Sequence, residues 1–231
     1  NGREHIFSVQ FSSVSGGKEQ NITDSFSPRF SGLGDRSGGW GSYVAEIDFY
    51  ENYPDNDPRK KHTYLVDTIA PNSGDILRFP DQGLQFPHVK KWMIKDKGMN
   101  GRGINFTVIR YADVLLMLAE AENEINGPTE LALNAINQIR ARARGNGIYP
   151  EDIDNSLDKD QLRDAIYRER ELELAFECHS WFDLKRTNRL LKVIGEQEGL
   201  PIQDKHRNFP IPQRELDNNP NLSQTDGWSG L

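Results

Sequence analysis

The side chains best suited to bind a ligand are aromatic residues in a glycine-rich loop. Trp40 stands among Gly38, Gly39 and Gly41, and Tyr43 follows closely. Glycines give a large ring little cover from its sequence neighbours, and an exposed aromatic face can stack against the apolar face of a sugar. We therefore predict that Trp40 and Tyr43 bind ligand. In the alternative interpretation, Trp40 packs into the domain and anchors the loop.

Trp92, within the sequence KKWMIK at 90–95, is the third aromatic candidate for ligand binding. The residues around it also fit a packed strand, in which the ring would belong to the core. Both interpretations stay open at the level of the sequence. The predicted ligand-binding set is therefore Trp40, Tyr43 and Trp92, and the glycine-rich surroundings favour the first two.

Two further segments resemble binding motifs but lack parts that those motifs need. Residues 32–39, GLGDRSGG, resemble a nucleotide-binding glycine loop, but we predict neither a strand before them nor a helix after them. Asp55, Asn56 and Asp57 offer oxygen ligands for a calcium ion. The later glycine and distal glutamate of a calcium-binding loop are absent, and Asp57-Pro58 fits a turn equally well. We predict no metal site and no cofactor.

Carboxylates are numerous in two later segments. They are Glu120, Glu122 and Glu124, followed by Glu169, Glu171, Glu173 and Glu177. Glycoside hydrolysis needs two carboxylates that face each other across a cleft, whereas alternate residues of a helix point to different sides. Arg168 and Arg170 are interleaved with the second group, which favours ion pairing. We expect a partly buried pair between Glu169 and an arginine, and no catalytic acid or base.

The usual arrangements of a catalytic nucleophile are also absent from the sequence. The five histidines are scattered, no serine lies in a GxSxG motif, and Cys178 directly precedes His179. Adjacent residues on a helix do not face each other, so the Cys178–His179 pair is not a nucleophile with its base. The sequence thus predicts a protein that is not an enzyme and has no catalytic residues.

Composition excludes several kinds of partner. The formal net charge of −7 disfavours nucleic acid and anionic membrane surfaces, which attract clustered Lys and Arg. The single cysteine excludes an internal disulfide and a cysteine-rich zinc site. No apolar run approaches the length of about 18 residues that suggests a membrane span. The mean hydropathy of −0.72 is low, but 11 Phe, 7 Tyr and 4 Trp predict a folded core.

The first hundred residues are predicted to form a loop-rich portion. Apolar and polar residues alternate over 5–11, which suggests one short strand. Residues 43–50 fit either a short strand or a helix. Prolines recur from position 54 to position 87 and keep the intervening elements short.

From Thr107 the apolar pattern becomes helical. A first helix is expected to end at Asn126-Gly127-Pro128, a second to begin after a Thr129 cap and end near Gly145, and a third to begin at Asp158. The expected inner faces are Val108, Tyr111, Ala112, Leu115, Leu118, Ala119 and Ile125, then Ala132, Ala135, Ile136, Ile139 and Ala143, then Leu162, Ala165, Ile166, Leu172, Ala175 and Phe176.

These elements predict a mainly α fold. Two helices joined by a short connector form a hairpin that resembles a tetratricopeptide unit, and a fourth helix is expected at 181–193. We predict one domain over 1–231, with a loop-rich portion at 1–100 and few short strands, and a helical portion at 101–231 with a loop-rich tail. One hairpin cannot bury its apolar face alone, so it should pack against the loops of the first hundred residues or against further helices.

Six motifs together resemble the C-terminal region of the SusD/RagB family in order and spacing. They are RYADVLLMLAEAENE (110–124), ALNAINQIRARA (132–143), RERELELAFE (168–177), WFDLKR (181–186), FPIPQREL (209–216) and NPNLSQ (219–224). The resemblance is specific from about residue 45 onward and loose before it.

The resemblance implies a defined role. SusD-like proteins are lipoproteins at the surface of the outer membrane of Bacteroidetes. They capture oligosaccharides, or sometimes peptides, for a SusC-like TonB-dependent transporter, and they are not enzymes. The resemblance also implies that an N-terminal lipid anchor, absent from these residues, is the link to the membrane. Glycan-contacting residues vary among such proteins, so Trp40, Tyr43 and Trp92 depend on their local context alone.

Two other functions are alternatives to oligosaccharide binding. In the first, the chain is a helical-repeat scaffold that binds protein or peptide through the apolar face of its hairpin, without recognising a glycan. Exposed aromatics at 31–43 would favour glycan binding, whereas a buried Trp40 beside an apolar groove would favour the scaffold. In the second, the chain is a glycoside hydrolase, which the pattern of charges does not support.

Overall fold

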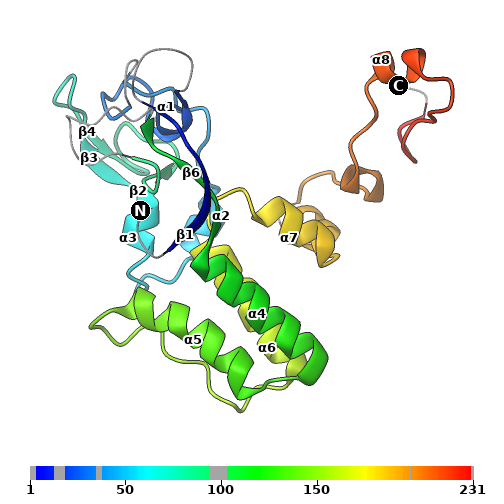
Figure 1. The fold of residues 1–231 in the computed structure, drawn as a ribbon. Helices are drawn as coiled ribbons and strands as arrows, with labels where there is room; N and C mark the ends of the chain where they lie inside the picture. Colours follow the sequence, from blue (N-terminus) through cyan, green and yellow to red (C-terminus); the bar gives the residue numbers. More distant parts are fainter. Residues whose placement is uncertain (1–3, 13–18, 35–37, 94–102, 198, 230–231) are drawn as a thin grey trace. The chain divides into compact units, whose positions relative to one another are not determined.

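The computed structural model describes residues 4–12, 19–34, 38–93, 103–197 and 199–229 (Figure 1). Contacts between residues divide the chain into two compact units, Asn1–Glu177 and Cys178–Leu231. The fold is helix-rich with few short strands, which confirms the predicted fold class. None of the described helices is both long and apolar enough to span a membrane.

Three helices of the first unit form its main core. They are α4 (Tyr111–Asn126), α5 (Glu130–Arg144) and α6 (Lys159–Glu173), and α4 packs against both of the others (Figure 1). The fully buried side chains at their centre include Leu116, Ile136 and Ile166. The predicted helical hairpin is therefore confirmed, with α6 packed against its first helix.

The ends of these helices follow the predicted signals. Gly127, with a φ of 82°, ends α4, and the Thr129 side chain accepts a hydrogen bond from the Ala132 N–H at the start of α5. Asp158 and Gln161 form a capping box at the start of α6. Each group in the capping box accepts a hydrogen bond from the other residue's backbone N–H, at 2.9 Å in both cases.

Removal of this capping box should have a measurable cost. Asp158→Ala should lower the free energy of unfolding by about 1 kcal/mol, because the first turn of α6 loses an acceptor for its free N–H groups. Urea unfolding followed by circular dichroism would measure the change. Asp158→Asn is the control, since asparagine also caps helices, and it should lie close to the wild type. An equal loss in both variants would contradict the capping role.

The inner face of α4 differs in part from the predicted one. Ala112, Leu115 and Ala119 are buried as expected, but the expected inner residues Tyr111, Leu118 and Ile125 are exposed. The exposed residues are spaced seven apart, so they form a stripe on the outer side of the helix. Leu116 and Asn123, outside the predicted face, are fully buried in their place.

The strands of the described residues form three two-stranded antiparallel pairs. β1 (His5–Val9) pairs with β6 (Phe106–Arg110), β2 (Tyr64–Leu65) with β5 (His88–Val89), and β3 (Asp67–Ile69) with β4 (Ile76–Arg78). The predicted strand near residues 5–11 is confirmed. The helix predicted from Thr107 instead begins at Tyr111, because the β-branched residues of 106–110 pair with β1, and Val108 therefore belongs to a strand.

Short helices and aromatic packing organise the rest of the loop-rich portion. The helices are α1 (Ile22–Phe26), α2 (Ile47–Glu51) and α3 (Lys60–Thr63), so the segment 43–50 ends in a helix. Tyr53 and Tyr64 are buried in a second core with Leu172. Since Leu172 belongs to α6, this core and the β1–β6 pair join residues on both sides of position 100.

The second unit consists of short helical segments. They are α7 (Ser180–Arg186), a π-helical segment η2 (Leu191–Gln197), a 3-10 helix η3 (Asp204–Arg207) and α8 (Gln213–Asn218). The single helix predicted at 181–193 is interrupted, because Asn188 adopts a φ of 57°, which an α-helix does not accept. Trp228 anchors the tail, since its indole N–H lies 3.0 Å from the Lys205 and Asn208 carbonyl oxygens.

Candidate functional site

The glycine-rich segment that carries Trp40 is held by backbone hydrogen bonds. The Phe30 N–H donates to the Gly39 carbonyl over 3.1 Å, and the Gly41 N–H donates to the Ser27 carbonyl over 2.8 Å. The Trp40 N–H itself donates to the Asp24 carbonyl over 2.7 Å. Residues 38–41 therefore lie along α1 and the turn that follows it, and the backbone at Trp40 has a defined position.

Two glycines of this segment are required by its backbone. Gly39 has a φ of 105°, and a Cβ at this position would lie 2.2 Å from the Pro28 carbonyl oxygen. Gly41 has a φ of 60°, and a Cβ there would lie 3.3 Å from the Arg29 nitrogen. The conformation disfavours a side chain at both positions. The glycines on either side of Trp40 thus allow the segment to lie close to residues 27–30.

The two favoured ligand-binding candidates are exposed on this segment. Trp40 is 39% exposed and Tyr43 is 61% exposed, and the Tyr43 ring packs at 5.6 Å against Phe26. Phe30, whose backbone is bonded to Gly39, is 70% exposed. We call Phe30, Trp40 and Tyr43 the aromatic surface. Of the two alternatives for Trp40, the structure shows the exposed one, and the ligand-binding role of Trp40 and Tyr43 stays a prediction.

Sequence reasoning missed Phe30 as part of this surface. Its only local signal is its place between Pro28 and Gly32, within a segment rich in turn-forming residues. Phe30 has a φ of 56°, a conformation that is uncommon for a residue with a side chain. The exposed ring was not predictable from periodicity, because the segment has none.

Trp92, the third candidate, lies in a different environment. It is only 9% exposed, its ring stacks on Phe106 with centroids 5.5 Å apart, and its indole N–H donates to the Phe176 carbonyl over 2.9 Å. It lies in a connecting segment rather than in one of the strands. The packed interpretation of Trp92 therefore has structural support, and its place in a ligand site stays a prediction.

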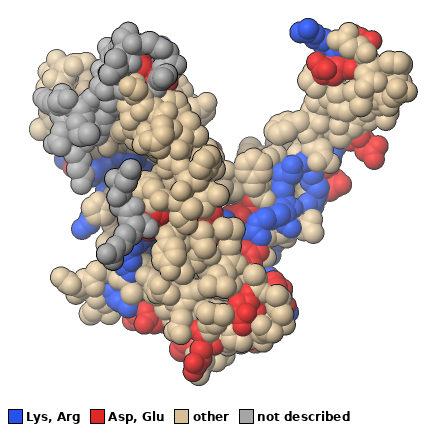
Figure 2. All heavy atoms as spheres, viewed as in Figure 1, with Lys and Arg blue, Asp and Glu red and all other residues tan. Residues whose placement is uncertain are grey.

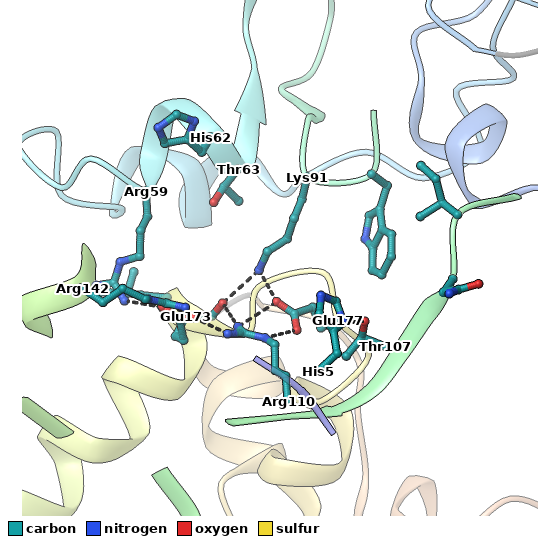
Figure 3. Close-up of a pocket in the computed structure, with 14 residues that line it drawn as sticks. His5, Arg59, His62, Thr63, Lys91, Thr107, Arg110, Arg142, Glu173 and Glu177 are labelled. Atoms are coloured by element: carbon teal, nitrogen blue, oxygen red, sulfur yellow. Dashed lines mark hydrogen bonds and ion pairs between the residues drawn. The ribbon is translucent and has the colours of Figure 1, made fainter. Parts of the chain in front are cut away.

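Trp92 also lines a cavity of about 400 Å³, which is shown in Figure 3. Most of the side chains labelled there are charged or titratable, and Lys91, Arg110 and Glu177 converge at its centre. The labelled lining residues are His5, Arg59, His62, Thr63, Lys91, Thr107, Arg110, Arg142, Glu173 and Glu177. The cavity thus differs from the aromatic surface in its chemistry.

Ion pairs hold most of the charges around this cavity. The Arg110 guanidinium lies 2.6 Å from a Glu177 carboxylate oxygen and 2.5 Å from one of Glu173. Arg59 also pairs with Glu173, at 3.0 Å, and Arg142 and Lys91 pair with Glu173 and Glu177 respectively. We call these six residues the ion-pair network. The network thus links β6, α5, the residue before α3 and Lys91 to Glu173 at the end of α6 and to Glu177 beyond it.

The titration of the two carboxylates in this network opposes a role for either as a catalytic acid. Burial by itself raises the pKa of Glu173, but Arg110 and Arg142 outweigh burial and lower the pKa to about 2. Burial likewise raises the pKa of Glu177, and Lys91 and Arg110 lower it overall. Both carboxylates are therefore ionised near neutral pH, whereas a catalytic acid would need a raised pKa. The network is best explained as a set of ion pairs that stabilises the packing of the loop-rich portion against the helices.

The predicted buried pair of Glu169 is confirmed. Glu169 is fully buried, and its two oxygens lie 2.6 Å from Arg59 and 2.7 Å from Arg140. Its partners come from α5 and from the 57–60 turn rather than from its own helix. Arg170 instead pairs with Asp113 of α4 at 2.9 Å.

The candidate calcium ligands are engaged by basic side chains. Asp57 accepts from Arg59 through both oxygens, at 2.7 Å for the closest contact, and Lys60 lies 2.6 Å from Asp55. Within the described residues, no group of three or more His, Cys, Asp and Glu side chains is arranged to hold a metal ion. The turn interpretation of 55–58 agrees with this geometry, since α3 begins at Lys60.

Comparison with known proteins decides the family. The sequence model of the SusD family matches residues 85–228, which is more than half of the chain. The chain belongs to the SusD family. The matched residues include Lys91, Arg110 and Glu177 of the ion-pair network, but they begin after Trp40 and Tyr43. Family membership therefore supports the scaffold and leaves the aromatic surface to be argued from this structure.

Two curated relatives come from Formosa agariphila. SusD-like protein P2 is 35% identical over 200 residues, covering 80% of this chain and 39% of that protein. SusD-like protein P25 is 38% identical over 202 residues, covering 84% of this chain and 36% of that protein. This SusD-family chain thus spans less than half the length of these relatives.

Solved structures share the fold at lower identity. A SusD superfamily protein from Parabacteroides distasonis superposes with a TM-score of 0.75 at 24% identity, covering 97% of this chain and 50% of that one. Surface glycan-binding protein A from Bacteroides thetaiotaomicron, solved in complex with laminarihexaose, gives a TM-score of 0.71 at 23% identity. That alignment covers 96% of this chain and 52% of that one. At these identities the comparison establishes the fold alone.

Proposed function

We propose that this SusD-family chain binds oligosaccharide or polysaccharide on the aromatic surface without catalysing a reaction. The observation that carries the proposal is the exposure of Phe30, Trp40 and Tyr43 on two segments that backbone hydrogen bonds join. Two proteins of the same fold support it: one was solved with laminarihexaose, and another is described as a laminarin-binding SusD-like protein. Their ligands suggest the class of ligand and do not transfer residue by residue.

The physical chemistry of the aromatic surface suits a sugar. A pyranose ring has apolar C–H faces, and stacking on an indole or phenol ring removes these faces from water. The segment 38–41 is fixed by hydrogen bonds to residues 24–30, so little backbone entropy is lost when a ligand binds. Stacking on exposed rings gives modest affinity, which permits release of the ligand.

Replacement of Trp40 tests this proposal. Trp40→Ala should weaken binding to a polysaccharide that retards the wild type by roughly 30-fold, on the order of 2 kcal/mol, because a central stacking ring is lost. Native affinity gels with a panel of polysaccharides would measure the change, and circular dichroism should show unchanged helix content. Trp181→Ala is the matched control, since Trp181 lies outside the aromatic surface. Unchanged retardation of Trp40→Ala would remove Trp40 from the site.

We also propose a place in the cell from family membership. The full-length protein would be a surface lipoprotein of the outer membrane, anchored through an N-terminal lipid outside these residues. It would deliver the saccharide to a SusC-like TonB-dependent transporter. The match to the SusD family supports this role. Co-purification of the full-length protein with the transporter from solubilised outer membranes would test it, and recovery of the protein from the soluble fraction would contradict it.

One observation favours a second function, contact with another protein or peptide. Tyr111, Leu118 and Ile125 form the exposed stripe along α4 described above. Apolar side chains at this spacing are typical of a helix that packs against another helix. A saccharide would not need this stripe, so the two functions use different surfaces. Binding to polysaccharide that survives Leu118→Asp would separate them.

A further inference from the structure

Arg29 lies next to the residues of the aromatic surface and carries a positive charge. Its side chain is exposed, and its guanidinium carbon lies over the Phe30 ring, 5.1 Å from the ring centroid. Among the residues that the structure describes, no carboxylate lies within ion-pair distance of Arg29. Its charged group is therefore held in place by an aromatic ring and faces solvent.

This state of Arg29 is unusual within its unit. Every other described arginine of Asn1–Glu177 forms an ion pair with a carboxylate. These pairs are Arg59–Asp57, Arg78–Asp67, Arg110–Glu177, Arg140–Glu169, Arg142–Glu173, Arg144–Asp152, Arg163–Glu124, Arg168–Glu171 and Arg170–Asp113. Both signs of charge occur on the face shown in Figure 2, most of which is neither acidic nor basic. Within the described part of this unit, Arg29 is thus the one arginine without a carboxylate partner.

The backbone places Arg29 next to Trp40. A Cβ on Gly41 would lie 3.3 Å from the Arg29 nitrogen and 3.5 Å from its Cβ, so the two segments are in contact. The adjoining Phe30 N–H bonds to Gly39, on the other side of Trp40 in the sequence. Arg29 and Phe30 therefore run alongside the segment that presents Trp40.

We propose that the saccharide bound by the aromatic surface is anionic, and that Arg29 binds its carboxylate or sulfate group. This inference rests on the proposed glycan-binding function and names the class of glycan. A guanidinium that stacks on an aromatic ring keeps its N–H groups along its edge, where they can donate two parallel hydrogen bonds to an oxyanion. Phe30 holds that group in place, so fewer side-chain conformations are lost on binding than for a free arginine.

The expected selectivity follows from this division of roles. The rings bind the apolar face of any pyranose, whereas Arg29 adds affinity only where a negative group is present. Uronic acid residues and sulfate esters both carry such a group, and their oxygens accept from arginine in the same manner. The remainder of the chain is acidic and repels a polyanion, so binding of an anionic glycan depends on this local charge.

Affinity gels that contain laminarin, polygalacturonate or carrageenan provide a neutral, a carboxylated and a sulfated probe. Arg29→Ala should weaken retardation by at least one anionic polysaccharide by about tenfold and leave any retardation by laminarin unchanged. Arg29→Lys should recover part of the loss, since it restores charge without the fork geometry. Arg214→Ala is the matched control, because Arg214 is exposed and has no ion pair with a described residue. It should behave as the wild type.

The results separate the inference from the function on which it rests. Selective loss with polygalacturonate or with carrageenan identifies a carboxylate or a sulfate ester as the anion. Wild-type binding to laminarin alone, or equal losses with neutral and anionic probes in Arg29→Ala, overturns the role of Arg29 and leaves glycan binding intact. If Trp40→Ala also leaves every interaction unchanged, the aromatic surface itself is refuted.

Discussion

Replacement of Glu173 by alanine is expected to lower the free energy of unfolding by about 3–5 kcal/mol. Glu173 is buried and lies within ion-pair distance of Arg59, Arg110 and Arg142. Its loss leaves buried guanidinium groups without their shared carboxylate, which is the costly way to break a buried pair. Urea unfolding of the 231-residue chain, followed by far-ultraviolet circular dichroism, would measure the change.

Glu171→Ala is the matched control for this prediction. Glu171 belongs to the same helix and pairs with Arg168 at 3.3 Å, but its side chain is partly exposed to water. Partly exposed pairs contribute about 1 kcal/mol or less, so this variant should remain close to the wild type. Equal losses in the two variants would show that the ion-pair network does not join the loop-rich portion to α6.

The same network predicts a direction for the effect of pH. The pKa of Glu173 is lowered in the folded chain to about 2 from an ordinary value of 4.5. Because the pKa is lower in the folded chain than in the unfolded chain, the ionised Glu173 stabilises the fold fully at a pH above the unfolded-state pKa. This stabilisation is lost as the pH falls from the unfolded-state pKa to the folded-state pKa. Stability should therefore decline between about pH 4.5 and pH 2. In Glu173→Gln this part of the decline should be absent.

Leu116→Asp is expected to unfold the helical core, with a cost of several kcal/mol for an unpaired buried charge. Leu116 is fully buried between α4 and its neighbours, whereas Leu118, two residues later, is 40% exposed. Leu118→Asp makes the same chemical change on the outer side of the helix and should cost about 0.5 kcal/mol or less. Thermal unfolding of both variants would measure the contrast. Similar losses would mean that the stripe at Tyr111, Leu118 and Ile125 is covered.

The helices were predictable because their signals are local. Apolar spacing, the Thr129 cap and the Asp158–Gln161 capping box lie within a few residues of the structure they produce. The boundary at Tyr111 was missed because it depends on pairing with β1, about one hundred residues earlier. The face of α4 was predicted only in part, since Tyr111 and Ile125 are apolar but face outward. Periodicity does not distinguish a core stripe from an exposed one when both are present.

The ion-pair network shows a similar limit. The density of charge around Glu169 indicated ion pairing, and a buried Glu169–arginine pair is present. Its partner Arg59 lies 110 residues away, and Arg110 lies 67 residues from Glu177. No sequence signal in a single chain links such positions. Their pairing follows from the way in which the loop-rich portion packs on α6.

The candidate site was predictable only as far as glycine content indicates exposure. Trp40 and Tyr43 are exposed on the segment where the glycines place them. Phe30 and Arg29 were missed, because they join this surface through backbone contacts with Gly39 and Gly41. The sequence did not show that Trp92 differs from Trp40 and Tyr43 in its exposure, because Trp92 is covered by stacking on Phe106 of β6.

The most direct test of the proposed function is a crystal structure of the chain with an oligosaccharide from the polysaccharide that retards it most strongly. We expect a sugar ring stacked on Trp40 or Tyr43, with the Arg29 guanidinium at its anionic group. A sugar bound in the cavity beside Trp92, with none on the aromatic surface, would contradict it. That result would move the binding site to the ion-pair network and leave the exposed rings without a ligand.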